Sequence, residues 1–138
     1  MALLAPDRPA VVVLADDLIW ATRLADAVRA AGAESRPARH LPALEAALAL
    51  ATDAVPPAFV IVDLTARGYE PLAAVRAAAA TGARVLAIGQ HDDHQLRRAA
   101  LAAGAERVLA YRRLHEAGPA TLRAWLSAPS RPAGGPTP

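Results

Sequence analysis

Three aspartates stand where strands of a sheet are expected to end. Asp16 and Asp17 directly follow the apolar run 10–15, and Asp63 closes the apolar run that begins at Phe59. If the two runs are neighbouring parallel strands, their carboxyl ends lie at one edge of the sheet and the three carboxylates converge. Carboxylates that lie so close together repel one another and attract a hard divalent cation such as Mg²⁺. A metal-bound pocket would let Asp63 act as a nucleophile toward a phosphoryl donor.

The elements that must position these aspartates follow from hydrophobic periodicity. The expected strands cover residues 10–15, 33–39, 59–63, 84–88 and 107–111. The strand over 33–39 is the weakest, because Pro37 suits only an edge strand or a strand end. Between the strands, Ala-rich segments of helical period predict helices after Asp17, over 41–50, over 71–80, over 92–103, and from Glu116 or Pro119 to about residue 126. Strict alternation predicts an α/β fold, a parallel sheet covered by helices on both faces.

Composition and length limit the class of protein. The 138 residues are 54% apolar but only 4% aromatic, so Ala, Leu and Val must form the core. The absence of Cys excludes disulfides and thiolate chemistry. No apolar run approaches the ~20 residues of a membrane span, and the N-terminus lacks a signal-peptide pattern. We expect a cytoplasmic protein with no membrane partner: a lead at 1–9, one domain at 10–126 and a disordered Pro/Gly-rich tail at 127–138.

The basic residues are unusual in type rather than in number. All 15 are Arg, Lys does not occur, and the formal net charge is +2. The arginines are scattered, with short pairs at 97–98 and 112–113 and no long basic stripe. We therefore expect no nucleic-acid partner.

Several short motifs occur in a fixed order along residues 10–126: LADD at 14–17, VIVDL at 60–64, GARVLAI at 82–88 and AAGAERVL at 102–109. In this order and spacing the chain resembles the receiver domain of two-component response regulators. The resemblance implies a three-layer (βα)5 doubly wound, flavodoxin-like sheet with strand order 2-1-3-4-5. It further implies that Asp63 is the phosphoacceptor, and that Mg²⁺ is bound by Asp16, Asp17, Asp63 and the backbone carbonyl of Thr65.

The resemblance fails at the positions that couple phosphorylation to a change of shape. The family places Ser or Thr after the fourth strand, where this chain has Gly89. The family's Lys-Pro pair after the fifth strand corresponds to Tyr111 and Arg112. A planar guanidinium on Arg112 or Arg113 does not replace a flexible ammonium. The sequence leaves open whether Tyr111 points into the pocket or outward to a partner.

These features predict an atypical, stand-alone receiver-like signalling module. It would take a phosphoryl group on Asp63 from a histidine kinase, with Mg²⁺, and act by binding another signalling protein. The expected partner surface is the fourth helix, fifth strand and fifth helix, near Arg97, Arg98, Arg112 and Arg113. The alternative is a pseudo-receiver, an unphosphorylated interaction domain that could form a homodimer. A metal-dependent hydrolase is the third candidate; we expect no enzyme, because no general base or oxyanion donor is evident beside the carboxylates.

Some of these residues also have purely structural interpretations. Asp17 could cap the first helix, and Asp63 could be a turn residue. The run HDDH at 91–94 contains potential metal ligands, but contiguous side chains point in different directions. One of its aspartates as the N-cap of the fourth helix is the favoured interpretation, with His91 near the acidic pocket as the alternative.

Overall fold

Five parallel strands form one sheet in the computed structural model, which describes residues 8–50 and 58–129. The strands are β1 (Ala10–Leu14), β2 (Glu34–Ala38), β3 (Phe59–Asp63), β4 (Arg84–Gly89) and β5 (Arg107–Ala110). Their order is β2-β1-β3-β4-β5, and every pair is parallel. The predicted fold class and strand order are confirmed.

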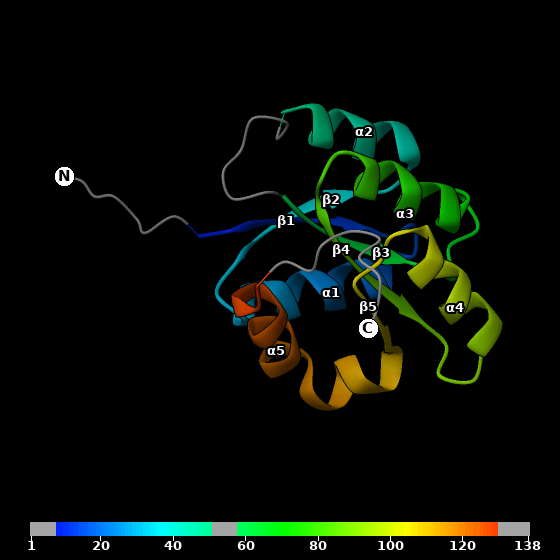
Figure 1. Ribbon diagram of the computed structural model, residues 1–138. Coiled ribbons are helices and arrows are strands. Elements are labelled where there is room, and N and C mark those ends of the chain that lie inside the picture. Colours follow the sequence, from blue (N-terminus) through cyan, green and yellow to red (C-terminus); the bar gives the residue numbers. More distant parts are fainter. Residues whose placement is uncertain (1–7, 51–57, 130–138) are drawn as a thin grey trace.

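Helices cover both faces of the sheet. They are α1 (Leu18–Ala30), α2 (Leu41–Leu50), α3 (Pro71–Ala80), α4 (His94–Ala103) and α5 (Tyr111–Ser127). Figure 1 shows α1 and α5 on one face, and α2, α3 and α4 on the other. Residues 1–7 of the predicted lead (1–9) and residues 130–138 of the predicted disordered tail (127–138) lie outside the described residues, whereas Ser127 is the last residue of α5. None of the helices in the described part is long and apolar enough to cross a membrane.

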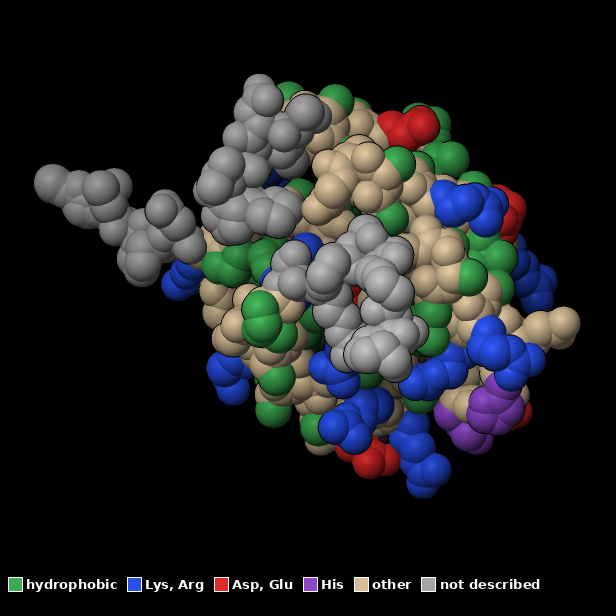
Figure 2. Space-filling view, in the orientation of Figure 1, with side chains coloured by type: hydrophobic (Ala, Val, Ile, Leu, Met, Phe, Trp, Pro, Cys, Tyr) green, Lys and Arg blue, Asp and Glu red, His purple; other side chains and the backbone are tan. Residues whose placement is uncertain are grey.

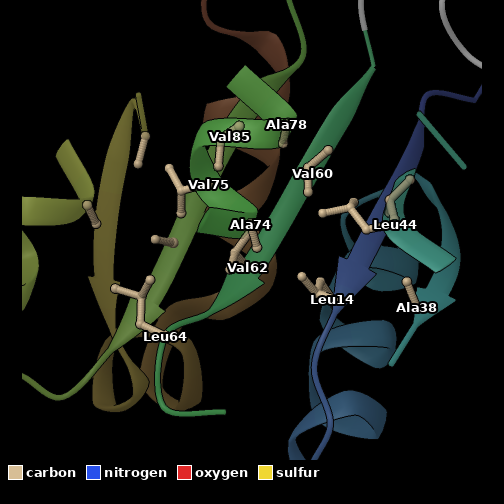
Figure 3. Packing of buried hydrophobic residues seen from close by; sticks show 14 of the residues in the cluster. Leu14, Ala38, Leu44, Val60, Val62, Leu64, Ala74, Val75, Ala78 and Val85 are labelled. Carbon is tan, nitrogen blue, oxygen red and sulfur yellow. The ribbon is translucent and has the colours of Figure 1, made fainter. Parts of the chain in front are cut away.

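The alternation of side chains along the strands divides the core in two. Val11 and Val13 of β1 pack with α1 and α5, whereas Val12 and Leu14 pack on the opposite face. On that second face small residues of α3 approach the sheet closely (Figure 3). Every residue of β3 is buried, as expected for a strand that neighbours others on both sides. A core poor in aromatics therefore packs through Ala, Val and Leu, as composition predicted.

The edge position of β2 explains how a strand tolerates proline. Pro37 lies opposite Val13 of β1 and has no second neighbouring strand. A residue without an N–H can occupy this position because the other side of β2 needs no ladder partner. The prediction of an edge strand here is confirmed.

The last helix begins earlier than predicted. The strand expected over 107–111 ends at Ala110, and α5 begins at Tyr111 rather than at Glu116 or Pro119. Ala117 has non-helical angles (φ −147°, ψ 33°), so α5 is two helical segments joined at a kink. The kink leaves Pro119 in the first turn of the second segment, where its missing N–H costs little. The periodicity located this second segment and missed the first.

A glycine closes α4 where its neighbour comes very close. Gly104 has φ 122°, and a Cβ there would lie 2.5 Å from the Cβ of Ala79 on α3. Any other residue would have to push α3 and α4 apart. The Gly-Ala lead into β5 therefore has a packing reason.

An ion pair fastens the end of the sheet where the strands begin. Arg84 of β4 donates from Nε and Nη2 to the two carboxylate oxygens of Glu106, each at 3.0 Å. The side chains are only 9% and 14% exposed. Nε1 of Trp125 donates to the same carboxylate at 3.1 Å, and Nη1 of Arg84 donates to the carbonyl of Ala128 at 2.7 Å. The pair thus joins β4, the approach to β5 and the end of α5.

We predict that Arg84→Ala lowers the free energy of unfolding by about 3 kcal/mol, because it leaves the carboxylate of Glu106 largely buried without its cation. Urea denaturation followed by circular dichroism measures the change. The control is Arg36→Ala, whose pair with Glu34 is more than half exposed on both sides and should be worth about 0–1 kcal/mol. Equal losses in the two variants would contradict this account of Arg84.

Candidate functional site

The predicted aspartates all lie at the carboxyl edge of the sheet because β1 and β3 are neighbours. Leu14, the last residue of β1, lies opposite Val62, so Asp16 and Asp17 follow β1 close to where Asp63 closes β3. Asp63 is also in register with Ile88 of β4. Two strand ends therefore place the acidic residues at one edge, as the alternation of elements predicted.

Asp63 is buried and held by three donors. Its exposed fraction is 1%. Oδ1 accepts hydrogen bonds from the N–H of Thr65 at 3.0 Å, from the Thr65 hydroxyl at 2.9 Å, and from the hydroxyl of Tyr111. Oδ2 is buried and has no hydrogen-bond partner among the described residues. One carboxylate oxygen is thus saturated, and the other is enclosed.

Tyr111 points into the site, which settles the question that the sequence left open. It is the first residue of α5, and its hydroxyl contacts both Asp63 and the hydroxyl of Thr65. Its ring lies against Trp20 of α1, with centroids 4.1 Å apart. Burial, and then the hydrogen bond to Asp63, raise the pKa of the Tyr111 phenol. At neutral pH Tyr111 is therefore an uncharged donor.

Tyr69 was missed by the sequence analysis. Its buried hydroxyl lies 3.0 Å from the carbonyl oxygen of Leu14 and 2.7 Å from that of Asp63, and its one hydrogen serves these two acceptors. Burial, and then the charges of Asp63 and Asp16, raise the pKa of this phenol. Tyr69 joins the ends of β1 and β3. The only hint in the sequence is that the chain has just two tyrosines. The residues around each tyrosine do not indicate that Tyr69 binds the backbone carbonyl of Asp63 and Tyr111 its carboxylate.

Asp16 and Asp17 bind backbone N–H groups. Oδ2 of Asp16 accepts from Arg67 at 3.1 Å and from Gly68 at 2.6 Å. A Cβ on Gly68 would lie 2.9 Å from that oxygen, so any other residue there would displace the Asp16 carboxylate from its present position. Oδ1 of Asp17 accepts from the N–H of Trp20 at 3.0 Å and caps α1. The helix-capping interpretation of Asp17 is confirmed.

This arrangement does not fit a magnesium centre. The described part of the chain has no group of three or more acidic, His or Cys side chains placed to hold a metal ion. The carboxylates of Asp16, Asp17 and Asp63 each face a protein donor instead of a shared point. Thr65, predicted to offer its backbone carbonyl, is seen here to donate its N–H and hydroxyl to Asp63. Magnesium binding requires these carboxylates to leave their present donors, and it stays a prediction.

The altered switch positions add no charge to the site. Gly89 ends β4 without a hydroxyl, although a Cβ there would make only an ordinary contact of 3.4 Å with Leu64. Arg112 pairs with Glu116 at 3.0 Å on the exposed surface of α5. Among the ion pairs of the described residues, none includes Asp63. Within residues 8–50 and 58–129, the partners of its carboxylate are hydroxyl and N–H groups.

The run HDDH at 91–94 serves helix formation. Oδ1 of Asp93 accepts from the N–H of Leu96 at 3.0 Å and caps α4, which begins at His94 rather than at residue 92. The prediction of an N-cap is confirmed.

Comparison with known proteins identifies the fold. No family model matches the chain, and no curated protein matches its sequence. Among solved structures, a receiver domain from Rhodospirillum rubrum is 18% identical, with a TM-score of 0.69 over 89% of this chain and 96% of the other. A receiver protein from Burkholderia phymatum is 28% identical, with a TM-score of 0.62 over 75% and 82%.

A response regulator from Burkholderia pseudomallei, solved with a phosphorylated aspartic acid, a calcium ion and citrate, is 20% identical, with a TM-score of 0.60 over 86% and 73%. The chain also matches NtrX from Brucella abortus but spans only 24% of its length. The chain therefore has the fold of response-regulator receiver domains, as the sequence motifs predicted.

Tyr69 and Tyr111 are the only tyrosines of the chain, and both have raised pKa values. These values predict how tyrosine ionisation and the free energy of unfolding change at alkaline pH. Absorbance at 295 nm should show no tyrosinate forming with a midpoint near pH 10, the ordinary value, while the protein stays folded. The unfolded phenols ionise near pH 10, whereas the folded ones ionise at higher pH. Their contribution to stability is therefore complete below pH 10 and is lost as the pH rises toward the folded pKa.

Tyr111→Phe should make the fall in unfolding free energy above pH 10 less steep. The reduction is at most about 1.4 kcal/mol per pH unit, and smaller because the phenol is partly exposed. Urea denaturation between pH 8 and 11 measures both slopes. A native tyrosine midpoint near pH 10, with unchanged circular dichroism, would show that neither hydroxyl is enclosed as described.

Proposed function

We propose that this chain is a receiver-like signalling module that acts by binding another protein while Asp63 stays unphosphorylated. The observation that supports this proposal is that the Asp63 carboxylate is closed off: Tyr111 and Thr65 donate to Oδ1, and Oδ2 is buried. This corresponds to the pseudo-receiver alternative of the sequence analysis. The receiver fold of the neighbouring structures supports the coarser statement that the chain is a signalling module.

Access is the first physical reason. A carboxylate attacks a phosphoryl group only when one oxygen can meet phosphorus in line with the leaving group. Oδ1 of Asp63 is surrounded by three donors, and Oδ2 has essentially no solvent-accessible area. Attack would first require Tyr111 and Thr65 to release the carboxylate, at a cost of several hydrogen bonds to a charged group.

Charge is the second reason. The resemblance to receivers assigns a Lys to the position of Tyr111, and an ammonium offsets the negative charge of an incoming phosphoryl group. Tyr111 is neutral at physiological pH, since its pKa is raised by burial and by the bond to Asp63. Gly89 provides no hydroxyl to sense the phosphoryl group. A phosphorylated Asp63 would thus have neither charge compensation nor a conventional switch.

A phosphorylated receiver is the second candidate. The enclosed, unpartnered Oδ2 of Asp63 favours it, because such an atom lacks a ligand. The Burkholderia pseudomallei neighbour also carries a phosphorylated aspartic acid beside calcium. In this candidate a histidine kinase would supply the phosphoryl group, and Asp16, Asp17, Asp63 and the Thr65 carbonyl would turn to Mg²⁺. Both candidates describe a cytoplasmic binding module without enzymatic turnover.

Exposure to Mg²⁺ and acetyl phosphate distinguishes the candidates. We expect the intact mass to gain no phosphoryl group, about 80 Da, because the nucleophilic oxygens are not accessible. An active receiver domain treated in parallel confirms that the reagent works. A gain in the wild type that is lost in Asp63→Asn would overturn the proposal in favour of the phosphorylated receiver.

The variant Gly89→Thr/Tyr111→Lys tests the reason for this inertness. It restores a hydroxyl and an ammonium and removes the phenol from Asp63. We expect it to acquire the adduct that the wild type lacks, and circular dichroism checks that it is folded. A folded double variant that remains unmodified would show that Tyr111 and Gly89 do not account for the closed state.

A further inference from the structure

A shallow groove of about 490 Å³ runs between α4 and the β5–α5 connection. We call it the arginine groove, and its main lining residues are Arg97, Leu101, Arg107, Val108 and Arg113. Figure 2 shows Arg side chains gathered over α4 and the start of α5. The groove lies on the face formed by α4, β5 and α5, where the sequence analysis placed a partner.

The positive charge of the groove is not neutralised from within. Arg97, Arg107 and Arg113 are exposed, and none takes part in an ion pair among the described residues. Glu106, the acidic residue at its edge, is committed to Arg84 and to Trp125. Three unpaired guanidinium groups in one groove exceed the net charge of +2 of the whole chain.

The groove also offers an apolar contact. Leu101 of α4 is 42% exposed, one of few large apolar side chains so exposed in the described part of the chain. It lines the groove together with Arg97 and Val108. The groove thus offers a ligand both cationic and apolar contacts.

We propose that the arginine groove binds an acidic segment of a partner protein, in which Asp or Glu side chains flank an apolar residue. This deepens the proposed function and rests on it, since it names the chemistry of the partner. Guanidinium groups bind carboxylates in a planar, bidentate geometry, and Leu101 contacts the apolar residue of the segment.

The lining favours a protein over a nucleic acid. Single-stranded nucleic acids bind to grooves that combine cations with aromatic rings on which bases stack. The part of this groove that the structure describes is lined by Arg, Glu, Leu, Val and Ala, without an aromatic side chain. An exposed leucine at that position suits a peptide side chain better than a phosphate backbone.

Fluorescence anisotropy with a short labelled peptide of alternating Glu and Leu tests the proposal on the full chain. We expect binding that weakens with salt, and about tenfold weaker binding by Arg97→Gln/Arg107→Gln/Arg113→Gln. The matched control, Arg8→Gln/Arg67→Gln/Arg76→Gln, removes the same charge outside the groove and should change binding less than about twofold. A peptide with Lys in place of Glu should not bind.

Four results would overturn the proposal: no binding by the wild type, equal losses in both triple variants, tighter binding of a labelled DNA oligonucleotide than of the peptide, or a wild-type dimer that the groove variant abolishes. The last two would assign the groove to nucleic acid or to a second copy of the chain.

Melting curves check that the variants are folded. If the groove variant is unstable, Arg97→Gln and Arg113→Gln, which lie at exposed helix positions, are measured singly. The intact-mass assay with acetyl phosphate measures phosphorylation of Asp63 without involving the groove. A failure of this inference can therefore be distinguished from a failure of the proposed function.

Discussion

A carboxylate buried in the centre of the sheet edge must be given donors, and this requirement organises the site. An ionised group taken out of water costs several kcal/mol unless hydrogen bonds or an opposite charge stabilise it. The chain contains no Lys, and no ion pair of the described residues reaches Asp63. Its donors are instead one backbone N–H and the hydroxyls of Thr65 and Tyr111. The hydrogen bonds that stabilise the charge of Asp63 also close the pocket.

This requirement is met in part by the start of the last helix. Tyr111 reaches Asp63 because helix α5 starts directly where β5 ends, and Trp20 supports the ring from the other side. Leu114, three residues later, enters the core between the sheet and α1. The kink at Ala117 then realigns the chain, so that Leu122 and Trp125 pack in the same cluster. The kink, two residues before Pro119, thus lets α5 pack at both of its ends.

The sequence predicted what depends on local patterns and missed what depends on distant contacts. Helices at 41–50 and 71–80, the edge strand around Pro37 and the placement of Asp16 and Asp63 at one edge of the sheet all follow from periodicity and from the rules of parallel sheets. The bond between Tyr111 and Asp63 joins residues 48 positions apart, and that between Tyr69 and Leu14 joins residues 55 apart. No period in the sequence reports such pairs. The N–H donors of Asp16 were likewise invisible, since they come from backbone.

The contacts of Arg84 separate the two ends of the sheet. Its guanidinium donates to the carbonyl of Ala128 where the strands begin, while Asp63 closes the opposite end of β3. The end of α5 and the acidic pocket therefore depend on different residues: Arg84, Glu106 and Trp125 at one end, Thr65 and Tyr111 at the other. A substitution that loosens the first set leaves in place the hydrogen-bond donors that Asp63 has among the described residues.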